Sequence, residues 1–133
     1  MKKNIFILSL VTVLMFLLVG CQKEGKTDNA KVDLGKSDVY SEQEREDAVE
    51  AVKEKFKEFT NCELTKIWYD EITEFASSTL KDENKIVLYT DFKTGDVEKD
   101  SGLTKNSKVN GWSWTLQRDN KDDEWRIVDY GEG

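Results

Sequence analysis

Apolar and polar residues divide this chain into three segments. Residues 5–19 are apolar except for Ser9 and Thr12, and residues 22–39 are polar, with two glycines and no periodicity. Helical and strand patterns follow from residue 40 onward. We therefore expect a leader over 1–20, a tether over 21–39, and a single domain over 40–133. The tether is predicted to be disordered, because it has too few apolar residues to bury.

The domain begins with an amphipathic helix, predicted over residues 41–59. Ser41 and Glu44 fit the S-x-x-E capping box, which satisfies the free backbone amides at a helix start. Apolar residues then recur at helical spacing on one face: Ala48, Val49, Val52, Phe56 and Phe59. Charged residues fill the other faces, so the pattern predicts one side on a core and one side in water.

Four strands are predicted after this helix, because short runs rich in β-branched and aromatic residues alternate with turn residues. Their ranges are 63–69, 85–93, 112–118 and 124–130. A short second helix is predicted over 71–81, and 94–111 is the longest irregular segment. The turn at 119–123 joins the last two strands into an antiparallel hairpin.

This order of elements predicts an α+β domain, with the N-terminal helix packed on a curved, cone-like, four-stranded antiparallel sheet. Alternation assigns side chains to the two faces of each strand. One face carries Ile86, Leu88, Thr90 and Phe92 in one strand, and Trp112, Trp114 and Leu116 in the next. In the last strand, Trp125 and Ile127 are predicted to share one face, and Val128 and Tyr130 the other.

The leader has the pattern of a signal peptide, with Lys2 and Lys3 ahead of the apolar run. The run is shorter than the ~20 residues that span a bilayer as a helix. Leu18-Val19-Gly20-Cys21 resembles the lipobox of bacterial lipoproteins, in which the cysteine sulfur carries a diacylglycerol and the chain is cut before the cysteine. This resemblance implies a lipid anchor at Cys21 and a place on the extracytoplasmic face of the cell membrane. The alternative is a secreted protein whose cleavage site happens to precede a cysteine.

The net charge and the residue types of the chain from Cys21 onward exclude several classes of partner and catalysis. Without Lys2 and Lys3 it has 18 basic and 27 acidic residues, a net charge of −9. That charge argues against nucleic acid as a partner, since nucleic acid requires a basic surface, and against direct adsorption to anionic lipid. The chain has no histidine, which excludes Cys-His and Ser-His catalysis and removes the commonest zinc ligand. Cys62 is expected to be a small buried apolar residue.

Several motifs together resemble a known family. They are the capped helix, WYDE at 68–71, VLYTDFK at 87–93, GWSW at 111–114 and WRIVDYG at 125–131. Over about residues 39–130 the chain is similar to small, uncharacterised lipoproteins of Gram-positive bacteria, which are related to the nuclear-transport-factor-2-like (SnoaL-like) cone fold. The resemblance implies a fold but no activity, because the family has none assigned.

Two sets of residues are candidates for a site. The first set is three tryptophans, Trp112, Trp114 and Trp125. We expect them either to fill the core or to line a pocket between sheet and helix. The second set is two strand carboxylates, Asp91 and Asp129. We expect them either to face water or to meet beside that pocket as a desolvated acid-base pair. The acidic stretches do not match a calcium loop, and no phosphate-binding loop, zinc spacing or nucleophile motif occurs. We therefore expect no catalytic residue, metal or cofactor.

These observations favour a non-catalytic, lipid-anchored binding or interaction domain whose ligand is unknown. Its only predicted partner of known kind is the membrane, reached through Cys21. The alternative is a small-molecule-binding cone or small enzyme that uses strand carboxylates beside the tryptophans. A third possibility is an immunity-type protein that blocks a partner with its acidic surface.

Overall fold

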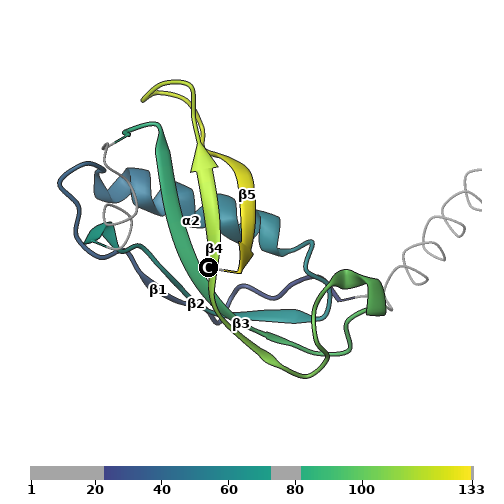
Figure 1. The fold of residues 1–133 in the computed structure, drawn as a ribbon. Helices are drawn as coiled ribbons and strands as arrows, with labels where there is room; N and C mark the ends of the chain where they lie inside the picture. The colour runs from purple at the N-terminus through teal and green to yellow at the C-terminus, as the bar shows by residue number, and fades with distance from the viewer. Residues whose placement is uncertain (1–22, 73–81, 133) are drawn as a thin grey trace, which may run out of the picture.

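One helix crosses one face of an open, five-stranded mixed sheet in the computed structural model of the protein (Figure 1). The structure describes residues 23–72 and 82–132. The sheet has the order β1-β2-β3-β4-β5, which is also the order of the strands along the chain. The elements are β1 (Lys31–Asp33), α2 (Glu42–Phe56), β2 (Cys62–Trp68), β3 (Lys85–Thr94), the 3-10 turn η1 (Lys99–Ser101), β4 (Lys108–Gln117) and β5 (Arg126–Glu132). The predicted α+β class is confirmed.

Helix α2 starts as the capping box predicts. The Ser41 hydroxyl accepts the Glu44 amide at 3.1 Å, and the Glu44 carboxylate accepts the Ser41 amide at 3.0 Å. Four of the five predicted apolar positions are buried in the helix: Ala48, Val49, Val52 and Phe56. The helix ends at Phe56, three residues earlier than predicted. Asn61, which has a left-handed backbone (φ 62°), lies in the turn that leads into β2.

Strands β2 to β5 pair antiparallel in the order of the chain, but the sheet as a whole is five-stranded and mixed, so the predicted four-stranded antiparallel sheet is correct only in part. The face assigned in β3 is confirmed, since Ile86, Leu88, Thr90 and Phe92 are all buried. In β5 the assignment is wrong. A bulge pairs Leu116 with Ile127 but Thr115 with Asp129, so one residue of β5 is skipped. As a result Ile127 and Tyr130 share the face toward α2.

The tether prediction is also wrong, because residues 23–39 pack on the domain. Strand β1 adds a fifth, parallel strand to the sheet beside β2, with Val32 opposite Ile67. Arg45 of α2 is 8% exposed and donates to the carbonyl oxygens of Leu34 and Gly35, both at 2.7 Å. These long-range contacts order a segment whose own apolar content is low.

The start of the described chain lies against the end of α2. The Gly25 amide donates to the Lys57 carbonyl at 3.0 Å, and the Lys26 amide donates to the Cys62 carbonyl at 2.9 Å. Only glycine permits this approach, because a Cβ at Gly25 would stand 2.0 Å from the Phe56 carbonyl oxygen.

Part of the predicted second helix lies outside the described residues. Glu71 and Ile72 have helical backbone, and 73–81 are not described. In the described ranges, no helix is both long and apolar enough to cross a membrane.

Candidate functional site

A groove of about 290 Å³ opens at the end of the sheet where α2 finishes. Its walls come from three places: the turn after α2, the loop between β3 and β4, and the neighbouring strands β4 and β5. The apolar and aromatic residues that line it are Phe59, Val97, Leu103, Trp112 and Tyr130. We call these five residues and the space between them the aromatic groove.

Phe59 is the residue that joins this groove to the core. Its ring stacks on Phe56 at 5.2 Å between centroids and is also close to Trp114 and Tyr130, at 5.4 and 5.6 Å. Because α2 ends before Phe59, the ring leaves the helix face predicted for it and forms the floor of the groove. Aromatic pairs at these separations add stabilisation beyond the area they bury, so the floor is held firmly.

The loop after β3 supplies the second wall. It is held to the end of β3 because the Thr94 amide donates to the Ser107 carbonyl at 2.8 Å and the Asn106 amide donates to the Gly95 carbonyl at 3.1 Å. Val97 is buried and Leu103 is partly buried against the core. These two apolar residues within a polar loop are a sequence signal for the groove that periodicity does not detect.

Trp112 stands at the edge of the groove with an unused donor. A bulge in β4 pairs Thr90 with Trp112 but Phe92 with Val109, and Gly111 takes a left-handed backbone (φ 69°) there. The Trp112 Nε1 is buried and, within the described part of the chain, has no hydrogen-bond partner. A buried donor without a partner costs about 1–3 kcal/mol, so this bulge is a costly point in the sheet.

The three predicted tryptophans are not gathered in one place. Trp114 is fully buried in the core, where its Nε1 donates to the Thr90 hydroxyl at 2.8 Å. Trp125 packs near the opposite end of β4, since the following residue, Arg126, pairs with Gln117. From Trp112 to Gln117 is five residues of strand, about 16 Å. Only Trp112 therefore lines the aromatic groove.

The alternative in which Asp91 and Asp129 meet as a pair is not what the structure shows. Asp91 accepts the Gly111 amide at 3.0 Å and so holds the bulge beside Trp112. Asp129 is exposed and pairs with Thr115, which is opposite Val87 on β3. Asp91 and Asp129 thus lie two strands apart, about 10 Å, and four residues apart along the strands, about 13 Å. Both point to the face of the sheet away from α2.

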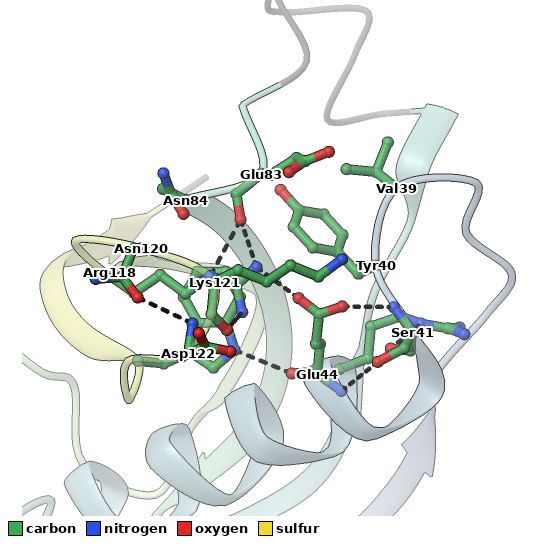
Figure 2. Close-up of polar contacts among 12 residues, drawn as sticks. Val39, Tyr40, Ser41, Glu44, Glu83, Asn84, Arg118, Asn120, Lys121 and Asp122 are labelled. Atoms are coloured by element: carbon green, nitrogen blue, oxygen red, sulfur yellow. Dashed lines mark hydrogen bonds and ion pairs between the residues drawn. The ribbon is translucent and has the colours of Figure 1, made fainter.

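A polar cleft of about 420 Å³ lies at the other end of α2, around Arg118 and Trp125. Figure 2 shows the polar contacts of Arg118 and Glu44 there. Arg118 donates to the Glu83 carbonyl at 2.7 Å and to the Glu44 carboxylate, and its guanidinium lies 4.2 Å from the centre of the Trp125 ring. The Trp125 Nε1 donates to the Glu44 carbonyl at 3.0 Å. These contacts tie the β4–β5 hairpin to the start of α2.

Glu44 is ionised by this arrangement. Burial opposes the charged form, but hydrogen bonds from Ser41 and Arg118 outweigh it and hold the pKa of Glu44 below its ordinary value. The buried cation of the cleft is therefore already paired. No group of three possible metal ligands is found in the ranges that the structure describes. We interpret this cleft as a structural clamp.

Cys62 behaves as predicted, as a small buried apolar residue. It is 4% exposed, and burial raises the pKa of its thiol. A thiol with a raised pKa is a poor nucleophile at neutral pH. The other cysteine, Cys21, lies outside the described residues.

Comparisons with known proteins find no family model, curated protein or solved structure that matches the chain. The resemblance to the Gram-positive lipoproteins and the anchor at Cys21 therefore remain predictions.

Proposed function

We propose that this protein is a lipid-anchored, non-catalytic binding domain on the extracytoplasmic face of the cell membrane, attached through Cys21. The order of charged leader, apolar run and lipobox supports the anchor. The aromatic groove supports the binding role, and it is the observation that carries this part of the proposal. It combines apolar and aromatic walls with a half-exposed Tyr130 (45% exposed), and two carboxylates, those of Glu58 and Glu98, also line it.

The ligand that fits such a groove is largely apolar. Apolar surface supplies most of the affinity in sites of this kind, and a few placed polar groups set the orientation. The rival enzymatic proposal loses its main support, because Asp91 and Asp129 are far apart and Asp91 already holds the Gly111 amide. The relation to the cone fold stays part of the proposal; an antiparallel meander with a helix on one face is consistent with it.

Metabolic labelling tests the anchor. Cells that express the full chain are grown with a fatty acid that carries a detectable tag. We expect the wild type and the control Cys62→Ala to carry the tag, because Cys62 is buried in the domain. Cys21→Ala should carry none and should leave the membrane fraction or remain uncleaved. Tag on the Cys21→Ala variant would rule out the proposed attachment.

A further inference from the structure

The described chain is fixed to the domain almost at the proposed anchor. The Asn61 amide donates to the Lys23 carbonyl at 2.9 Å, and the Gly25 and Lys26 amides are bonded to the turn after α2 and to β2. Only Gln22 separates Lys23 from Cys21. Consecutive Cα atoms are about 3.8 Å apart, so the chain between Lys23 and the proposed anchor is at most about 8 Å long. A lipid on Cys21 would therefore hold this end of the domain directly at the membrane surface.

The aromatic groove opens at the same end. Thr60 lines it and precedes Asn61, whose side-chain amide donates to the Asp96 carbonyl at 3.0 Å. Asp96 in turn precedes Val97 of the groove wall. Lys23, Asn61 and Asp96 also line one shallow depression next to the groove. Figure 1 shows the η1 loop close to the point where the described chain begins.

The chemistry of this end suits a lipid. Tryptophan and tyrosine favour the boundary between hydrocarbon and headgroups, because each has an apolar ring and a polar tip. Two ion pairs lie near the groove, Lys55 with Glu58 at 2.9 Å and Lys105 with Asp96 at 2.8 Å, and the carboxylate of Glu98 also lines it. Long-range attraction to anionic headgroups would therefore not be the basis of a contact between this end of the domain and a bilayer.

We propose that the aromatic groove faces the bilayer and takes an acyl chain of a membrane phospholipid. This inference rests on the proposed function, because the anchor at Cys21 is what brings the groove to the lipid. The anchor supplies proximity, and the groove then fixes which side of the domain meets the membrane. The contact is mainly apolar, so raising the salt concentration should leave it intact.

Quenching of tryptophan fluorescence by brominated lipid tests the inference. The full chain is expressed with its leader, purified from membranes in its processed form, and reconstituted into phosphatidylcholine vesicles with brominated or plain acyl chains. We expect strong quenching of the wild type by the brominated lipid and loss of most of it in Trp112→Phe. The control Trp68→Phe should keep it, because Trp68 stacks on Tyr89 on the sheet face away from α2.

A second pair of variants keeps every tryptophan in place. Leu103→Lys puts a charge in the groove wall and should abolish most of the quenching, whereas Val32→Lys, at a 40% exposed position on β1, should not. Circular dichroism checks that each variant is folded.

The experiment distinguishes failure of the anchor from failure of the groove inference. Absence of lipid on the purified protein would refute the proposed anchor. A lipidated, vesicle-bound protein whose quenching is unchanged by Trp112→Phe and Leu103→Lys would overturn the groove inference alone. A second copy of the chain could instead cover the groove and shield it from the bromines. A cross-linked dimer that Leu103→Lys abolishes would show this and would overturn the inference as well.

Discussion

Replacement of Trp114 by alanine tests whether the centre of the sheet is a filled core. Trp114 is fully buried, its ring centroid is 5.1 Å from that of Tyr130, and its Nε1 donates to Thr90. Truncation of a buried tryptophan costs about 3–5 kcal/mol. A domain of this size has about 5–15 kcal/mol of stability in total. Trp114→Ala should therefore lose a large share of the stability and be partly or wholly unfolded at room temperature.

Two further variants provide reference values for the loss of stability in Trp114→Ala. Trp114→Phe keeps most of the ring volume and removes the hydrogen bond to Thr90, which should cost about 1–3 kcal/mol. Trp68→Ala removes a half-buried ring on the other face and should cost clearly less than Trp114→Ala. Urea denaturation followed by far-UV circular dichroism gives all three free energies of unfolding. If Trp114→Ala costs no more than Trp68→Ala, the core is not filled as described.

Three more predictions concern the edges of the domain. Gly25→Ala should lower the free energy of unfolding by about 1–3 kcal/mol, because the added Cβ meets a helix carbonyl, while Gly131→Ala, in open space, should change it little. In thermal or urea denaturation, Arg118→Leu should cost about 3–5 kcal/mol, because it leaves buried partners unpaired; Arg126→Leu, which breaks an exposed ion pair, should cost under about 1 kcal/mol. The stabilisation from Glu44 should be complete above pH 4.5 and fall as the pH drops through its lowered pKa. In urea titrations at several pH values, the difference in free energy of unfolding between wild type and Glu44→Gln should therefore narrow on acidification.

The elements that the sequence predicts correctly are those set by local chemistry. The capping box at Ser41 and the alternation in β3 depend on residues a few positions apart, and both appear in the structure. The bulge in β5 depends on how that strand pairs with β4, so the face of Tyr130 could not be read from alternation alone.

Strand β1 had a weak local signal that its polar composition hid. Ala30, Val32 and Leu34 alternate with polar residues, but three such positions are too few to predict a strand. Its pairing with β2 and the bonds from Arg45 are long-range, and these contacts decide the outcome. The aromatic groove is harder still to foresee, because its five residues come from segments that meet only when the sheet forms.

We propose that Cys21 carries a lipid and is the first residue of the mature chain. Intact-mass spectrometry of the protein extracted from membranes tests this most directly. We predict the mass of residues 21–133 plus a diacylglycerol, with or without a further acyl group on the new amino terminus, and fragment ions that place the lipid on Cys21. A mass that corresponds to cleavage at another site, or to residues 21–133 without lipid, would contradict the account.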